Sequence, residues 1–427
     1  MIAHARNSFG GLKTQTQTTV LIGGNESFCA ERFGYKMTEK GLEPGLVPVE
    51  VEPVAKIANL VYAEYFYALG FTAFVTEYGA VTRWNSTDYA SLKTAAIVNP
   101  NPPFVVACAD GDEPTYAVIG GTKIAIFKGA AVSTHTLPYR MLGGTYHCGR
   151  IFAVDKDDPY VIRWSGFELR DWSLAIDAGG HMRISPRGGK ALCIVELGEK
   201  LIVVRERALT VLNALADARH FRLVQYGSVV LPAVKDKTAV VVGGKLWLCA
   251  ADGLYVYDGS ALSRVEVDTC GKSYSFERTA AFKDRYIYIT CTDDGGERCI
   301  LEYDTLTGAT VNFAKGGNMP FGAGEDLYCL AGERGTTLSL LTVGLEDENR
   351  VWTSRNIDLG TDRTKTLKYV TLEGEGNSEL VISCDGRTRT VNGKGKTYVG
   401  EVGVNFTFSI RGTGTVARLA AEWEVRK

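Results

Sequence analysis

The sequence predicts an all-β protein: a six- or seven-bladed β-propeller with an extended N-terminal arm and a C-terminal β-sandwich. The clearest evidence is the stretch of residues 238–267, where four short β-prone runs are separated by Gly-Gly and Asp-Gly pairs. These pairs favour the positive φ angles of two-residue hairpin turns, so the stretch predicts a four-stranded antiparallel meander. The second run is apolar on both faces, and such a sheet must be covered on both sides, as stacked propeller blades are.

Similar hairpins recur along the chain, which is the second observation. A recurrence of about 40–45 residues is what four-stranded blades require. Seven meanders are expected, or six if one of the first two belongs to a lead-in outside the propeller. Corresponding strands are expected to begin near residues 71, 115, 150, 200, 245, 285 and 326.

Three local expectations accompany the repeat. A hairpin between residues 115–119 and 123–127 should turn at Gly120-Gly121. Weak helical character is expected at residues 209–220, and one short helical turn at residues 88–96. No long helical pattern competes with the strands.

Three domains are expected, in the order arm, propeller and sandwich. Residues 1–50 read as a polar arm with little periodicity, which either lies on the protein surface or docks on a neighbouring subunit. Residues 51–352 form the propeller, and residues 353–427 change rhythm and predict a small antiparallel sandwich. No Pro/Ser-rich linker precedes the sandwich, so we expect a fixed orientation between the two domains.

The composition is that of a folded protein without a strong charge. The chain has 427 residues, a hydrophobic content of 45% and a formal net charge of −2. Broad electrostatic attraction to nucleic acid or to an anionic membrane is therefore not expected. The sequence has neither a charged-then-apolar leader nor an apolar run as long as a membrane span.

The cysteines fit folding in a reducing cytosol. All ten lie without CxxC spacing, and several occupy strand patterns, where cysteine behaves as a small core hydrophobe. Cys291 and Cys299 flank a hairpin turn and could face each other. A disulfide between these two residues therefore stays open as the alternative.

The enzyme alternative is a propeller glycoside hydrolase, which needs two carboxylates at the mouth of the central channel. Candidates are Glu77, Asp110, Glu206 and Asp252, and none of them is distinguished by its neighbours. The sequence has no GxSxG elbow and no repeated sialidase Asp-box. No catalytic or cofactor-binding residue is therefore assigned.

Phosphate and metal sites have little support in the sequence. Gly271-Lys272-Ser273 and Gly395-Lys396-Thr397 both lack the first glycine of a P-loop. The five histidines show no HxH or HExxH spacing, and His147-Cys148 is a poor chelate because adjacent strand residues point to opposite faces. No metal ligand is assigned, although Ca²⁺ stays open at two acidic turns, which are more often only solvated. These turns hold Asp110, Asp112 and Glu113, and Asp155, Asp157 and Asp158.

The tryptophans could bind sugars if they were exposed. They mostly lie within strand patterns, so burial in the core is the favoured interpretation. The six are Trp84, Trp164, Trp172, Trp247, Trp352 and Trp423.

The order of features resembles a family of virion proteins. The residues that carry the resemblance are SFGG at 8–11, GNES at 24–27, YVIRWS at 160–165, DW at 171–172, LIVVRE at 201–206, GKLWL at 244–248 and ADGLY at 251–255. This succession is similar to tail-hub or stabilization proteins of tailed bacteriophages and to related prophage structural proteins. Such proteins have a polar leader, a propeller without catalytic motifs and often β-rich appendages. The strongest part covers roughly residues 145–260, and the C-terminal sandwich departs from the family pattern.

The resemblance implies a ring of identical subunits around the tail axis, in contact with other phage tail or neck proteins. The favoured hypothesis is therefore a non-enzymatic virion structural protein, in the tail, tail hub or head–tail region. It would be made and folded in the bacterial host cytoplasm, and would have no cofactor, no direct nucleic-acid binding and no membrane span. Two alternatives stay open: a receptor- or glycan-binding propeller that contacts a host surface glycan, and the glycoside hydrolase.

Overall fold

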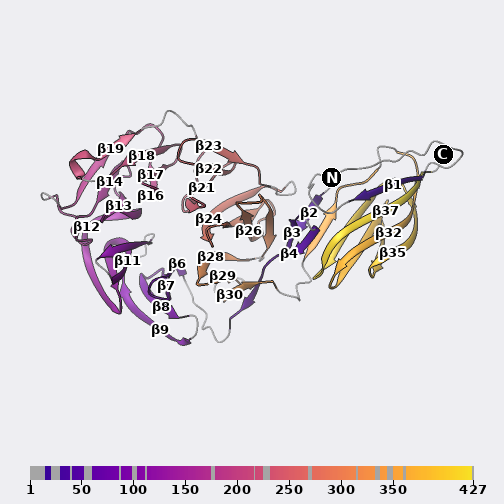
Figure 1. Cartoon of the computed structure of the whole chain (residues 1–427), viewed down its shortest axis with the longest axis horizontal. Helices are drawn as coiled ribbons and strands as arrows, with labels where there is room; N and C mark the ends of the chain where they lie inside the picture. Colours follow the sequence, from indigo (N-terminus) through magenta and orange to yellow (C-terminus); the bar gives the residue numbers. More distant parts are fainter. Residues whose placement is uncertain are drawn as a thin grey trace.

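A computed structural model shows an antiparallel all-β protein in which a ring of sheets lies beside a β-sandwich (Figure 1). In the described part of the chain, the one helical segment is the short 3-10 helix η2 (Ala218–His220). None of the described helical residues forms a helix long and apolar enough to cross a bilayer. The structure describes residues 15–20, 29–38, 41–51, 60–85, 88–98, 103–110, 113–174, 178–215, 217–224, 231–267, 272–313, 316–331, 337–343, 350–358 and 362–425.

The ring is built from meanders that follow one another along the chain. The first holds β6 (Leu60–Phe66), β7 (Phe71–Thr76), β8 (Ala80–Asn85) and β9 (Asp88–Ile97). A six-stranded sheet follows, with β10 (Phe104–Asp110), β11 (Glu113–Lys128), β12 (Ala131–His147), β13 (Arg150–Asp155), β14 (Val161–Trp164) and β15 (Gly180–Arg183). The next sheet holds β16 (Ala191–Leu197), β17 (Lys200–Arg205), β18 (Leu209–Asn213) and β19 (Arg222–Val224).

The second half of the ring continues this pattern. One sheet holds β20 (Val240–Val242), β21 (Lys245–Ala250), β22 (Gly253–Tyr257) and β23 (Leu262–Val265). Another holds β24 (Tyr274–Phe282), β25 (Tyr286–Asp293), β26 (Arg298–Asp304) and β27 (Thr310–Phe313). The last holds β28 (Asn318–Ala323), β29 (Asp326–Ala331), β30 (Thr337–Thr342) and, from the start of the chain, β5 (Val47–Glu50).

The described strands make seven blades. Each four-stranded sheet is one blade, and the six-stranded sheet is two, because β12 pairs with β11 through its first half and with β13 through its second. Seven separate hydrophobic clusters of described residues lie between successive blades, and the seventh joins the last blade to the first. Each blade therefore buries both of its faces, which confirms the propeller with the larger of the two blade numbers.

The stretch of residues 238–267 folds as the sequence predicts. It forms the blade β20–β23, and its first turn places Gly243 at φ 59° and Gly244 at φ 67°. The second strand, β21, buries both faces. Leu246 and Leu248 pack toward the preceding blade, while Trp247 and Cys249 pack toward the following one.

Two local expectations are wrong, and the helical character expected at residues 209–220 is realised only in η2. The chain does not turn at Gly120-Gly121: β11 runs straight through these glycines and exchanges one partner strand for another there. Residues 88–96 lie in strand β9, and residues 209–213 form strand β18 before η2. Pairing within a blade outweighs the weak local helix preference in both segments.

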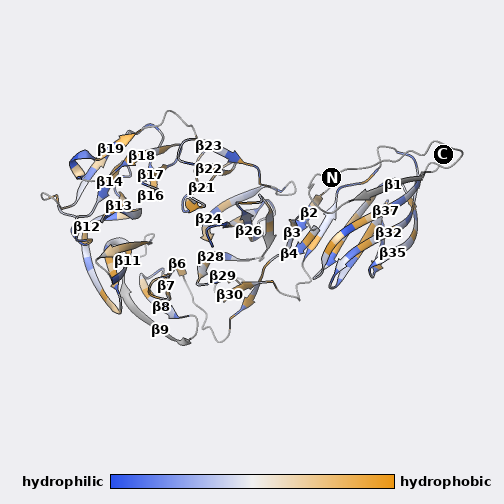
Figure 2. Ribbon diagram, in the orientation of Figure 1, coloured by the Kyte–Doolittle hydropathy of each residue, from blue (hydrophilic) through white to orange (hydrophobic). Residues whose placement is uncertain are grey.

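The sandwich takes strands from both ends of the chain. One sheet has the order β3-β4-β37-β32-β35 with β1 also on β37, and the other has the order β2-β31-β36-β33-β34. Hydrophobic and hydrophilic residues alternate along β37, β32 and β35 (Figure 2), as expected when only one face is buried. The early strands are β1 (Gln15–Val20), β2 (Cys29–Phe33), β3 (Tyr35–Thr38) and β4 (Gly41–Pro44). The late strands are β31 (Val351–Ser354), β32 (Lys365–Glu375), β33 (Ser378–Cys384), β34 (Arg387–Asn392), β35 (Gly395–Gly403), β36 (Phe406–Gly412) and β37 (Thr415–Val425).

The segment expected as an N-terminal arm is divided between the two domains. Where residues 1–50 are described, β1–β4 pair within the sandwich and β5 pairs with β30 as the outer strand of the last blade. The sandwich also begins earlier than residue 353, because β31 starts at Val351. The described strands of this segment are thus paired with other strands of the same chain.

Cys291 and Cys299 do face each other, as the hairpin suggested. They are directly opposite in the β25–β26 ladder, both are buried, and their Sγ atoms lie 3.6 Å apart. Both are free thiols, and their contact with each other and their burial raise the pKa of Cys291. The disulfide alternative is therefore not realised in the structure.

Candidate functional site

The carboxylates proposed for glycoside hydrolysis lie in different blades. Glu77 lies in the β7–β8 turn of the first blade and is exposed. Glu206 follows β17 and accepts a hydrogen bond from the Lys190 amide at 3.1 Å, and Asp252 in the β21–β22 turn accepts one from Tyr255 at 2.9 Å. The side chain of Asp110 lies outside the described residues. The three described carboxylates each serve a separate turn, and none of them is paired with another.

The acidic turn after β13 is held by arginines. Asp155 is buried, accepts hydrogen bonds from the amides of Asp157 and Asp158, and receives Nε of Arg163 at 2.6 Å. Asp157 pairs with Arg140 and Asp158 with Arg183. Among the described residues no group of three His, Cys, Asp or Glu side chains could hold a metal ion. The second acidic turn includes Asp112, which lies outside the described residues.

His147 is buried and its Nδ1 lies 2.7 Å from Glu196, whereas Cys148 is exposed and lies after the end of β12, in the turn before β13. The expected burial of the tryptophans is confirmed. All six tryptophans are at least nine-tenths buried, so none of them offers a platform for a sugar.

A cavity of about 530 Å³ lies on the axis of the ring. It is lined by the innermost strand of every blade, that is, by residues of β6, β10, β12, β16, β24 and β28 and by the segment that leads into β20. Most of the lining is apolar or small. A volume of this size lies within the range of small-molecule sites.

Arg278 crosses this central cavity. It stands on β24 of the sixth blade, yet its Nη2 donates to the carbonyl of Val61 in the first blade at 3.0 Å, and its guanidinium lies 5.6 Å from the ring of Tyr62. The seventh blade lies between these two partners in the ring order. Burial lowers the pKa of Arg278, and the charges of Tyr62 and Glu64 act against that decrease.

Glu64 is the carboxylate that sequence reasoning missed. It lies on β6 and lines the cavity together with Arg278, and the hydroxyl of Tyr62 donates to its Oε2 at 3.3 Å. Its side chain meets water in the cavity, yet it lies deep inside the ring. Burial raises the pKa of Glu64 to about 7, against the smaller lowering effects of the Tyr62 hydrogen bond and the Arg278 charge. One signal could have revealed it: a single acid at alternate spacing with Tyr62 in the apolar run of residues 60–66.

Replacing Glu64 with glutamine should stabilise the protein at alkaline pH and have little effect near pH 4. The native protein holds a proton on Glu64 that the unfolded chain has lost, between the ordinary pKa of 4.5 and the raised value of about 7. The contribution of this group to stability is therefore full below the lower value and is lost as the pH rises through the upper one. Urea denaturation at several pH values measures the difference. Glu77→Gln, at an exposed turn, is the matched control and should show no such pH dependence; equal profiles for the two variants would contradict the assignment.

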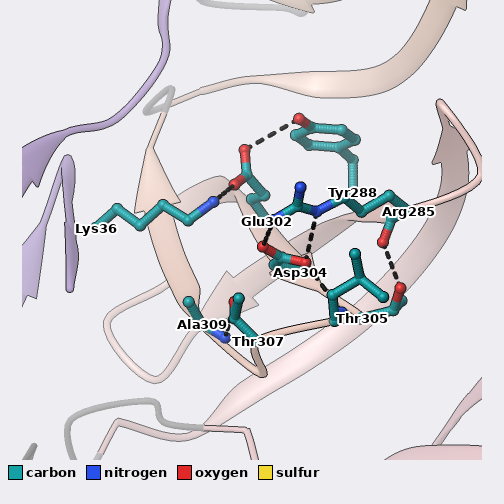
Figure 3. Close-up of polar contacts among 9 residues, drawn as sticks. Lys36, Arg285, Tyr288, Glu302, Asp304, Thr305, Thr307 and Ala309 are labelled. Carbon is teal, nitrogen blue, oxygen red and sulfur yellow. Dashed lines mark hydrogen bonds and ion pairs between the residues drawn. The ribbon is translucent and has the colours of Figure 1, made fainter. Parts of the chain in front are cut away.

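A second polar cluster joins the propeller to the sandwich (Figure 3). Lys36 on β3 reaches Glu302 on β26 with 2.6 Å between Nζ and Oε1, and the hydroxyl of Tyr288 donates to the other carboxylate oxygen at 3.0 Å. Burial and the charge of Glu302 raise the pKa of Tyr288, so the phenol stays protonated and able to donate. Nearby, Arg32 on β2 donates to Thr310 on β27 at 3.0 Å.

The turn that follows β26, close to Lys36, Glu302 and Tyr288, is held by a bidentate ion pair (Figure 3). Arg285 donates through Nε and Nη2 to the two oxygens of Asp304, at 3.0 and 2.6 Å. Burial raises the pKa of Asp304, but the hydrogen bonds from Arg285 and from the Leu306 amide outweigh it and hold the pKa below its ordinary value. The carboxylate therefore stays charged at neutral pH and keeps the end of β26 in place.

Comparison with known proteins identifies the architecture. No family model matches the chain, and no curated protein matches it. The β-propeller domain of Cps50 (Swd1) from Myceliophteria thermophila aligns with a TM-score of 0.50 and 12% identity, over 70% of this chain and 100% of that domain. The RRP9 WD40 repeats align with a TM-score of 0.44 and 10% identity, over 70% and 97%. The first of these likenesses supports the β-propeller fold, and at such identity it carries the fold alone.

Proposed function

We propose that the chain is a non-enzymatic structural protein of a tailed-phage virion, which works by packing against copies of itself and against other tail or neck proteins. The observation that carries this proposal is the joint of Lys36, Glu302 and Tyr288, which fixes the sandwich on the propeller through a largely buried ion pair. A block with two domains in one orientation suits an assembly in which each subunit meets several neighbours. The resemblance of residues 145–260 to phage propellers supports the virion as the location.

A non-catalytic role is favoured by the placement of the expected carboxylates. A glycoside hydrolase needs two carboxyl groups about 5–10 Å apart on either side of one bond. Glu77, Glu206 and Asp252 belong to turns of the first, fourth and fifth blades. Glu77 is exposed, Glu206 accepts the Lys190 amide, and Asp252 accepts the Tyr255 hydroxyl.

Glycan binding is a second candidate, and one observation favours it. Tyr369 on β32 and Tyr398 on β35 are 36% and 58% exposed on the sandwich, with ring centroids 5.4 Å apart. Exposed tyrosines offer an apolar ring face together with a polar hydroxyl. This platform lies on the sandwich and not on the propeller, where the sequence placed it.

Negative-stain microscopy of the purified protein tests the proposal. We expect closed rings or filaments of the chain at micromolar concentration. A protein that stays monomeric and binds host-envelope polysaccharide, with binding lost in Tyr398→Ala, would favour the glycan-binding candidate instead. Turnover of a chromogenic glycoside would overturn the non-enzymatic role.

A further inference from the structure

The central cavity has an unbalanced set of charges. Three cations, Lys237, Arg278 and Lys283, line it together with three carboxylates, Glu64, Asp236 and Asp284. Lys283 is paired with Glu325, and Asp284 accepts the Gly243 amide. The Asp236 side chain already accepts the amide of Lys237 at 2.9 Å. When Glu64 carries a proton, the cluster therefore holds one positive charge in excess.

The cations have donors to spare. Arg278 makes one protein hydrogen bond among the described residues, from Nη2 to the Val61 carbonyl, and it lines the cavity. Burial lowers the pKa of Lys237, and the charge of Arg278 adds to this effect, as expected where two cations lie close together. Thr279 ties the two positions, because its amide donates to the Lys237 carbonyl at 3.1 Å. Cations with free donors in a largely apolar cavity are readily satisfied by an anion.

The rest of the lining suits an apolar body. Phe104 and Phe321 border the cavity from the second and seventh blades, and Tyr65 borders it from the first. Planar guanidinium groups bind carboxylates well, because two N–H groups match two oxygens. We propose that the axial cavity is a binding site for a small organic monocarboxylate, held by Arg278 and Lys237 beside the carboxyl group of Glu64.

The site should also take up a proton when it binds the anion. Glu64 is faced by Tyr62 on its own strand, by Tyr67 just after that strand, and by Arg278 from β24. Lys237 and Asp236 line the same cavity. A second negative charge beside Glu64 favours its protonated form, so affinity should fall as the pH rises.

Saturation-transfer NMR with sodium benzoate as the probe tests the proposal on the full chain. Benzoate stays ionised from pH 6 to pH 8, so any pH dependence belongs to the protein. We expect affinity to be about tenfold weaker at pH 8 than at pH 6, because the protonated fraction of Glu64 falls by about that factor across its pKa of about 7. Glu64→Gln should make the two pH values equal.

Two arginine variants distinguish benzoate binding at this site from a general effect of charge on benzoate binding. Arg278→Gln should weaken benzoate binding at least tenfold, whereas Arg170→Gln, on an exposed loop of the third blade, should leave it unchanged. If Arg278→Gln fails to fold, Lys237→Met and Glu64→Gln still test the same cluster. No transfer signal from the wild-type chain, or an equal signal in wild type and Arg278→Gln, would overturn the proposal.

Discussion

Replacing Phe74 with alanine should lower the free energy of unfolding by about 3–5 kcal/mol. Phe74 is fully buried on β7 in the cluster that joins the seventh blade to the first. Its ring lies 5.6 Å from that of Trp84 and 5.7 Å from that of Phe321, which belongs to the seventh blade. The substitution removes a full aromatic side chain and leaves a cavity where the ring of blades closes, and neighbouring strands cannot collapse into that cavity without breaking their ladders.

Urea denaturation followed by tryptophan fluorescence measures this loss. Leu306→Ala is the control, because Leu306 is 76% exposed and its truncation should change stability by less than about 0.5 kcal/mol. A cost below about 1 kcal/mol for Phe74→Ala would mean that the seventh and first blades do not pack as described.

Replacing Lys36 with methionine should destabilise the protein by about 3 kcal/mol, because Glu302 would stay buried without its cation. The side chains of Lys36 and Glu302 are 19% and 7% exposed, so water can compensate only in part. The double variant Lys36→Met/Glu302→Gln removes both charges, keeps an acceptor for the Tyr288 hydroxyl, and should regain most of the loss.

A second lysine offers a matched control for burial. Lys396 pairs with Glu422 on the sandwich at the same distance of 2.6 Å, but these side chains are 51% and 30% exposed. Lys396→Met should therefore cost no more than about 1 kcal/mol. Equal costs for Lys36→Met and Lys396→Met would show that the joint between the domains is no stronger than an ordinary surface pair.

The parts of the fold that could be read from the sequence are those with local signals. Residues 238–267 carry their turns and their apolar pattern within thirty positions, and the blade forms there as predicted. Strand β11 shows where local signals fail. Gly120-Gly121 has the composition of a hairpin turn, but the strand continues through both glycines. The two glycines instead lie where β11 exchanges one partner strand for another, which depends on distant pairing.

The missed features depend on contacts between distant parts of the chain. Strand β5 pairs with β30, and Lys36 pairs with Glu302. These partners lie far away in the sequence, so residues 1–50 considered alone predict an arm. Glu64 was missed for a related reason. An acid in an apolar strand has meaning only when the strand is known to line the axis of the ring, where Arg278 arrives from another blade. The spacing of residues in the sequence shows neither that β6 lines the axis nor that Arg278 reaches it from another blade.

The pairing of early strands with late ones also sets the order in which the molecule can be completed during its synthesis. Strand β2 pairs with β31 and strand β5 with β30, and the late partners leave the ribosome roughly three hundred residues after the early ones. At about 5–20 residues per second, the early strands wait about 15–60 s with unpaired edges. The ring can close only after β30 has been made, and the sandwich only after the later strand β37, so the propeller can be completed before the sandwich.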